Sequence, residues 1–152
     1  MSVTELDFED CINEIQFRLI SAEHDRFKNI LFHMTELEKG KESMFVCDSL
    51  IREEAYIAEG LASGVYQTVK ALQSNNFNEM LVNCDDNGES IYNALFTMSD
   101  NFWGLFMRIA LYSFEIVRNK KKFFEICDEY PKEVELMKEH GEKVEKILNE
   151  AE

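Results

Sequence analysis

The residues of this chain that could do acid–base chemistry are few, and only one pair has a suggestive spacing. Arg18 and His24 are separated by five residues within a region of helical periodicity. An arginine and a histidine at this spacing on one helix can together cleave RNA. The chain has 16 Lys and Arg against 30 Asp and Glu, however, and its net charge of −14 repels the phosphates of RNA. We therefore expect two solvated side chains and no catalytic residue.

Histidines near carboxylates raise a second possibility, a metal site, at His24, His33 and His140. A di-iron helical bundle needs paired Glu-x-x-His motifs, which the sequence lacks. Glycine-rich phosphate loops, Gly-x-Ser-x-Gly and His-Glu-x-x-His are missing as well. The sequence predicts a protein that is not an enzyme and that uses no metal or other cofactor.

The cysteines indicate a reducing compartment, because they lie far apart and form no Cys-x-x-Cys pair. They are Cys11, Cys47, Cys84 and Cys127. The first residues, Met1 to Glu5, lack the basic and apolar regions of a signal peptide. We expect reduced thiols and a cytoplasmic protein.

The strong negative charge also limits the partners. It repels anionic lipid headgroups as well as nucleic acid, so neither is expected to bind directly. A basic ligand or partner protein is favoured instead.

Composition predicts an all-α fold in a single helical domain over residues 1–152. The chain has one proline and 6 glycines, and its apolar residues recur with helical periodicity. A chain of this length can bury a core without disulfides or metals. We expect a globular bundle of about seven helices around one buried central helix.

Three helical patterns precede residue 74. The first has an apolar face from Phe8 to Ala22, and the second runs from Phe27 to Leu37 and stops at Gly40, a suitable left-handed cap. The third extends from Ser43 to about Leu72 and is either one helix or two, because Gly60 and Gly64 offer a break.

Turn residues interrupt the pattern after residue 73. A single helical turn is predicted over 77–81 and a helix over 89–98. Ser99, Asp100 and Asn101 are residue types that cap helix starts. The next helix is therefore predicted to begin near Phe102.

The segment from Phe102 to Val117 is apolar around nearly its whole circumference, as expected of a helix enclosed by others. It is too short and carries too many charges to span a bilayer. The core pattern continues to Pro131, where a final amphipathic helix is predicted to begin.

Arg108 is the unusual residue of this inner helix. A buried, unpaired arginine costs several kcal/mol, so it must reach an acid, extend to water or lie at the floor of an open groove. Both an internal salt bridge and a groove arginine that awaits a partner's carboxylate are consistent with the sequence. Trp103, by comparison, is read as one large core side chain.

One stretch resembles the first homology motif of the B-cell lymphoma-two (Bcl-two) family of apoptosis regulators. It comprises the helix end from Ile91 to Phe96, then Asn101-Phe102-Trp103-Gly104, and a central helix that contains Ser113-Phe114. Two departures are an inserted Phe102 and a leucine, Leu105, where the family has an arginine. We infer that Arg108, three residues further on, replaces that arginine on the same helical face.

The resemblance implies a Bcl-two-like fold, similar to the tailless homologues of large DNA viruses, and an inhibitor of apoptosis. Such a protein sequesters the amphipathic death-promoting helix of pro-apoptotic proteins in a hydrophobic groove. It would act in the host-cell cytoplasm and reach mitochondria only through its partners. The implied groove residues are Val65, Val69, Leu72, Ile91, Leu95, Asn101, Gly104 and Arg108.

Two further questions stay open. The alternative function is an acidic helical bundle that neutralises a basic partner, such as a toxin or a nuclease. The oligomeric state is open because an empty apolar groove tends to be covered by the protein's own terminus or by a neighbouring chain, and a homodimer is the expectation.

Overall fold

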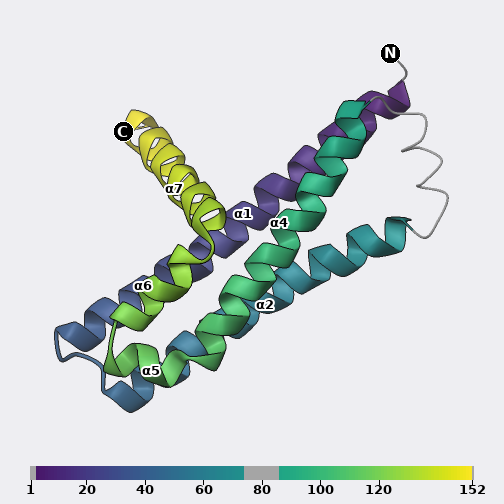
Figure 1. Cartoon of the computed structure of the whole chain (residues 1–152). Helices are drawn as coiled ribbons and strands as arrows, with labels where there is room; N and C mark the ends of the chain where they lie inside the picture. The colour runs from purple at the N-terminus through teal and green to yellow at the C-terminus, as the bar shows by residue number, and fades with distance from the viewer. Residues whose placement is uncertain (1–2, 74–85, 152) are drawn as a thin grey trace.

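The computed structural model describes the backbone of residues 3–73 and 86–151 and the side chains of residues 10–71 and 93–150. Every regular element within these ranges is a helix, so the all-α class is confirmed. Three long helices lie side by side (Figure 1): α1 (Val3–Glu38), α2 (Met44–Gln73) and α4 (Asp86–Leu111). Successive helices run in opposite directions, which makes an up-down-up bundle.

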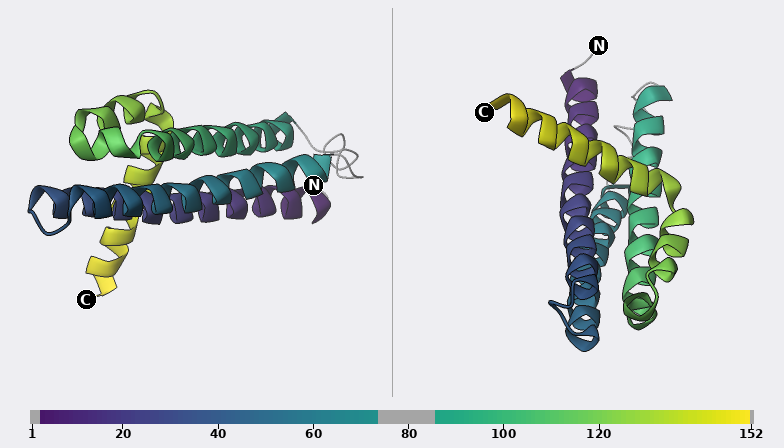
Figure 2. Two further views of the ribbon diagram at one scale, coloured as in Figure 1. Left: turned by 90° about the horizontal axis from the view of Figure 1, so that it is seen from below. Right: turned by 90° about the vertical axis from the view of Figure 1, so that its left-hand side faces the viewer.

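Three shorter helices complete the chain: α5 (Ser113–Arg118), α6 (Lys121–Asp128) and α7 (Pro131–Ala151). Figure 2 shows that α7 crosses α1 steeply and that its carboxyl end projects away from the bundle. The predicted start of the last helix at Pro131 is confirmed, and proline is favoured at this first helical position. None of the described helices is long and apolar enough to cross a membrane.

The two patterns predicted before Gly40 belong to one continuous helix, α1. The residues between them, Glu23 to Arg26, include no glycine or proline that would stop a helix. The third pattern is likewise a single helix, because neither Gly60 nor Gly64 interrupts α2. The helical turn predicted over 77–81 lies outside the described residues.

Gly40 ends α1 as predicted. Its φ of +73° is the left-handed conformation that glycine adopts without steric cost. The Gly40 amide donates to the carbonyl of Leu37 (3.0 Å) and the Lys41 amide donates to that of Glu36 (2.9 Å), which is a Schellman motif. Ser43 then caps α2, because its hydroxyl accepts a hydrogen bond from the Val46 amide (3.1 Å).

The helix boundary predicted at residues 99–101 is wrong. α4 passes through these residues without a break and ends at Leu111. Ser99 is fully buried, and its hydroxyl donates to the carbonyl of Phe96 within the same helix (3.0 Å). This hydrogen bond satisfies the Ser99 hydroxyl within the helix, so Ser99 does not cap a helix start.

The expectation of an inner helix buried on all sides is also wrong. One face of α4 is fully buried, with Phe102, Leu105, Phe106 and Ile109 at 0% exposure. The opposite face and the start of α5 are open to solvent at four apolar side chains: Trp103 (37%), Met107 (36%), Leu111 (72%) and Phe114 (56%). The apolar composition of α4 alone does not indicate which half of its surface is covered by α1 and α2.

Small residues let α2 approach its neighbours closely. Ala55, Ala58 and Ala62 recur on its buried face and are all at 0% exposure. On the α1 side, Arg26 forms an ion pair with Glu54 at 3.0 Å. On the α4 side, the indole N–H of Trp103 donates to the Glu59 carboxylate at 2.6 Å.

A buried polar network holds the start of α5 against α2. The Ser113 hydroxyl donates to Asp48 Oδ1 at 2.6 Å, and Arg52 pairs with Asp48 Oδ2 at 2.5 Å. Arg52 Nε also donates to the Ser113 hydroxyl at 3.3 Å. Asp48 is only 8% exposed and needs these partners, because an unpaired buried carboxylate is costly. The network therefore fixes the point where the chain leaves α4.

Replacing Ser113 by alanine should destabilise the fold by about 1 to 3 kcal/mol, because Asp48 loses a buried hydrogen-bond donor. Ser49→Ala, on the exposed side of α2, is the matched control and should change stability by less than about 0.5 kcal/mol. Urea unfolding followed by circular dichroism measures both. Equal unfolding midpoints for the two variants would show that the network does not stabilise the fold.

Candidate functional site

The structure brings Asn101, Gly104 and Arg108 together on the side of α4 that faces the junction of α6 and α7. Arg108 forms an ion pair with Glu129, the residue after α6. The Asn101 amide lies 3.5 Å from the Glu133 carboxylate, which is 3% exposed. Of the two arrangements that the sequence left open for Arg108, this structure contains a salt bridge within the chain, although it lies at the surface: the Arg108 side chain is 33% exposed and that of Glu129 is 49% exposed.

Gly104 lies directly beneath Tyr130. A Cβ atom built on this glycine would lie 2.7 Å from the Tyr130 hydroxyl oxygen, so the absence of a side chain is what lets Tyr130 approach. Together the segment from Glu129 to Glu133 covers the three residues of α4 to which the resemblance assigns ligand binding. We call this covered surface, formed by Asn101, Gly104 and Arg108, the α4 face.

The other predicted groove residues with described side chains do not belong to the α4 face. Val69 (1% exposed) and Leu95 (0%) are part of the core between α2 and α4, and Val65 is partly buried against it. Leu72 and Ile91 belong to α2 and α4, but their side chains lie outside the described residues. The six predicted residues whose side chains are described thus divide between the α4 face and the packed region between α2 and α4.

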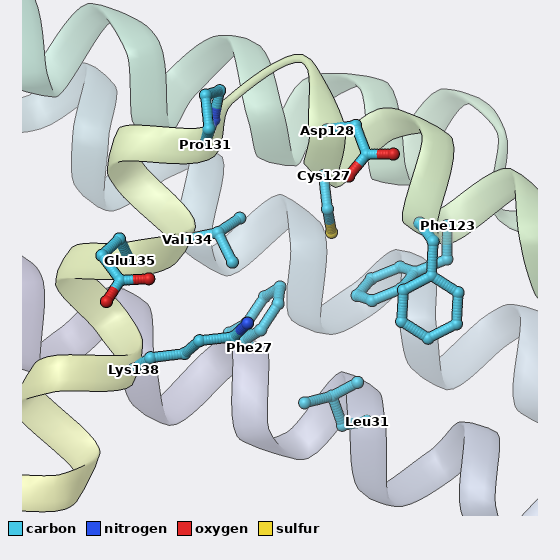
Figure 3. Close-up of a pocket in the computed structure, with 10 residues that line it drawn as sticks. Phe27, Leu31, Phe123, Cys127, Asp128, Pro131, Val134, Glu135 and Lys138 are labelled. Carbon is cyan, nitrogen blue, oxygen red and sulfur yellow. The ribbon is translucent and has the colours of Figure 1, made fainter.

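An open apolar pocket lies instead between α1, α6 and α7 (Figure 3). Its volume is about 350 Å³, and Phe27 and Leu31 of α1 face Cys127 and Val134 across it. The other lining residues are Phe123, Phe124, Asp128, Pro131, Glu135 and Lys138. The charged groups come from the end of α6 and from α7, so the pocket has an apolar interior and a mixed-charge rim.

A second pocket, of about 290 Å³, continues from the first along the crossing of α1 and α7. The two pockets share Phe27, Leu31 and Lys138. The second is lined in addition by His24, Lys28, Met137, Gly141, Val144, Glu145 and Leu148. We call the two together the trough. Both pockets are lined mainly by apolar surface, which is typical of a site that binds an apolar ligand or a helix face.

The trough was not predicted from the sequence, because the apolar residues that line it have the spacing of core residues. A usable signal was the pair Phe123-Phe124, since adjacent side chains on a short helix cannot both face the core. Phe123 is indeed buried, whereas Phe124 is 49% exposed. The steep crossing angle of α7, which opens the space beside Leu31, has no comparable signal in the sequence.

A buried carboxyl group lies close to this crossing. Glu23 is at 0% exposure, and neither of its carboxylate oxygens has a hydrogen-bond partner within the described part of the chain. Burial raises its pKa from 4.5 to about 9, and the nearby charge of Arg26 offsets this only in part. Glu23 is therefore protonated at neutral pH.

Two histidines, His24 and His140, pack against each other where α1 and α7 cross. The rings of His24 and His140 lie 5.4 Å apart, and burial followed by the proximity of His24 lowers the pKa of His140. Among the described residues, no group of three or more His, Cys, Asp or Glu is placed to hold a metal ion. Arg18 pairs with Glu14 at 2.8 Å while His24 packs on His140, so the pair considered for RNA cleavage does not converge.

The two buried thiols are poor nucleophiles. Burial is the main cause that raises the pKa of Cys47 to about 11 and that of Cys127 to about 12. Both are free thiols, and at neutral pH they are protonated. Cys127 therefore contributes apolar surface to the trough and no reactive group.

The chain matches no protein-family model, no curated protein and no solved structure. Its function is therefore inferred from its own residues.

Replacing Glu23 by glutamine should stabilise the protein increasingly as the pH rises. The unfolded chain ionises this carboxyl above pH 4.5 while the folded chain keeps the proton until about pH 9, so the wild type loses stability across that window. The advantage of the variant should grow by about 1.4 kcal/mol per pH unit between pH 5 and 8. Urea unfolding at several pH values measures this, with Glu53→Gln, at an exposed position on α2, as the control.

Parallel stability profiles of wild type and Glu23→Gln would contradict a carboxyl group that is buried and protonated. The control should follow the wild-type profile throughout.

Proposed function

We propose that this protein binds an amphipathic helix of a partner protein in the trough. The observation that carries the proposal is the pair of adjoining apolar pockets over Phe27 and Leu31. A helix in a groove inserts anchor side chains spaced at i, i+3 or i+4, and i+7. Two pockets in line along α1 suit two successive anchors, and Lys28, Lys138 and Glu135 at the rim offer charged contacts to the flanks of the helix.

The ligand class that we propose is the death-promoting helix of pro-apoptotic Bcl-two proteins. Support comes from the motif order on α4, in which Asn101, Trp103 and Gly104 precede Ser113-Phe114. The protein would then inhibit apoptosis by sequestration in the cytoplasm of a host cell. A seven-helix Bcl-two-like arrangement is part of this proposal.

The location that we propose for the ligand differs from the one that the resemblance implies. In the family, the arginine and glycine of this motif lie in the groove, but here Glu129 and Tyr130 occupy the α4 face. The trough, on the α1 side of α6 and α7, is open. We therefore assign the ligand to the trough and a structural role to Arg108.

A second candidate function is favoured by charge alone. A net charge of −14 would attract a basic toxin or nuclease, and the protein would neutralise it by covering its surface. Such binding would weaken strongly with added salt, because exposed charges are screened within about 8 Å at physiological ionic strength. Apolar anchoring in the trough would depend much less on salt.

Isothermal titration with a set of death-promoting helix peptides tests the first function. Submicromolar binding is expected, and Leu31→Glu should weaken it at least about tenfold because a charge enters the apolar floor. Leu111→Glu, an exposed apolar residue on the far side of α4, should leave it unchanged.

Arg108→Glu distinguishes the two locations. Binding that survives this change supports the trough, whereas binding lost in Arg108→Glu and retained in Leu31→Glu would place the ligand on the α4 face. No binding to any peptide would contradict the function itself, and salt-sensitive capture of basic proteins would then favour the second candidate.

A further inference from the structure

Two connections of the chain lie together at one end of the bundle. The α1–α2 connection and the α5–α6 connection are neighbours at the lower left of Figure 1. The ammonium group of Lys120, in the second connection, lies 2.9 Å from the carboxylate of Glu38, the last residue of α1. Segments 38–46 and 114–122, which contain the two connections, therefore belong to the same end of the molecule.

The charge of these two segments is opposite in sign to that of the whole chain. They contain six lysines and arginines against three glutamates, a net charge of +3. Because the chain as a whole carries −14, all other residues together carry −17. Four of the five residues over 118–122 are basic. We call the exposed surface of segments 38–46 and 114–122 the basic end.

The acids of the basic end are already paired, whereas most of its cations are not. Each of the three carboxylates contacts a basic side chain: Glu38 contacts Lys120, Glu42 contacts His33 and Glu115 contacts Lys122. Four exposed cations form no ion pair within the described part of the chain, namely Lys39, Lys41, Arg118 and Lys121. The basic end therefore presents unpaired positive charge to solvent.

Exposed apolar side chains accompany these cations. Phe45, in the first turn of α2, is 84% exposed, the highest value among the large apolar side chains that the structure describes. Its neighbours Met44 and Val46 are 47% and 46% exposed. On α5, Phe114 is 56% exposed, and the Cζ atom of Arg118 lies 5.5 Å from the centre of its ring. Cations beside exposed apolar side chains are typical of a surface that lies on a membrane, where the cations contact anionic headgroups and the apolar groups enter the acyl boundary.

The acidic remainder of the molecule does not prevent this contact. The net charge predicts repulsion from anionic lipid only where the charge is spread evenly. Exposed charges are screened within about 8 Å at physiological ionic strength. α1 has 36 residues and begins at the far end of the bundle, so it extends about 54 Å away from the basic end. Acids in its amino-terminal half are therefore several screening lengths from a surface that touches the basic end.

The apolar residues favour a membrane over nucleic acid. Nucleic acid also offers phosphates to the cations, and its bases stack on aromatic rings such as that of Phe45. The aliphatic side chains of Met44 and Val46 gain nothing from stacking. Insertion at the boundary of the acyl chains removes aliphatic and aromatic side chains from water alike.

We propose that the basic end binds the surface of a membrane that contains anionic lipid, with its four unpaired cations on the headgroups and Phe45 at the boundary of the acyl chains. The attachment is peripheral. It goes beyond the proposed function, because neither Phe45 nor any of the four cations lines the trough.

Co-sedimentation of the full chain with lipid vesicles tests the proposal. One set of vesicles contains phosphatidylcholine alone, and the other contains phosphatidylcholine mixed with the anionic lipid phosphatidylserine. Binding to the mixed vesicles is expected, should weaken as salt is added, and should be at least about tenfold weaker without phosphatidylserine. A wild type that does not bind the mixed vesicles at low salt overturns the proposal.

Charge reversal locates the contact. Arg118→Glu/Lys121→Glu should weaken vesicle binding at least about tenfold, because each lysine or arginine at an anionic surface strengthens binding roughly fivefold. Lys143→Glu/Lys146→Glu is the matched control, since it changes the total charge by the same amount on the projecting half of α7. The control should bind as the wild type does. Equal losses in the two variants would show that total charge decides the binding, and would overturn the basic end as the contact.

Phe45→Ala tests the apolar part of the contact. It should weaken binding to the mixed vesicles at least about threefold, whereas Ile147→Ala, at a 64% exposed position on α7, should not. Unchanged binding of Phe45→Ala would contradict insertion of this side chain. Circular dichroism checks the helix content of every variant. Lys39→Glu/Lys41→Glu, in the other connection, repeats the charge test if Arg118→Glu/Lys121→Glu does not fold.

Two further measurements separate this inference from its alternatives. Duplex DNA that binds through the basic end, without any binding to vesicles, would replace the membrane by nucleic acid and overturn the proposal. Peptide binding to the trough is measured without vesicles, so either it or vesicle binding can fail while the other stands.

Discussion

The structure depends on one packed face of α4. Phe102, Leu105, Phe106 and Ile109 are fully buried there against α1 and α2, and the alanines of α2 let the helices come close. Burying side chains of this size stabilises a fold by roughly 1.5 to 3 kcal/mol each. Because this face points into the bundle, the opposite side of α4 faces solvent, although its residues are nearly as apolar.

The junction of α6 and α7 connects this core to the surface that we propose as functional. On one side it covers the α4 face, through Glu129 on Arg108 and Tyr130 on Gly104. On its other side it forms two walls of the trough, while α1 supplies the floor. The short connection between α6 and α7 therefore covers the α4 face, which the resemblance implies as the ligand surface. The trough lies on the other side of this connection.

Several local features of the fold could be predicted from the sequence, but the placement of the helices relative to one another could not. Helical periodicity and the scarcity of glycine and proline identify the all-α class, and Gly40 and Pro131 mark two boundaries that the structure confirms. The prediction that Ser99 caps a helix start was wrong. The sequence alone does not distinguish a capping serine from one whose hydroxyl donates to a carbonyl of its own helix, as Ser99 does. Burial of Val69 and Leu95, and the trough itself, depend on how helices cross, which residue spacing does not specify.

The central claim, that the trough between α1, α6 and α7 receives a partner helix, is tested most directly by methyl NMR. Leucine and valine methyl groups would be observed while a helix peptide is added. The account predicts shifts and peptide contacts at Leu31, Val134 and Val144, with Leu111 unaffected. Shifts confined to Leu111, or to Val65 and Leu95 between α2 and α4, would contradict it.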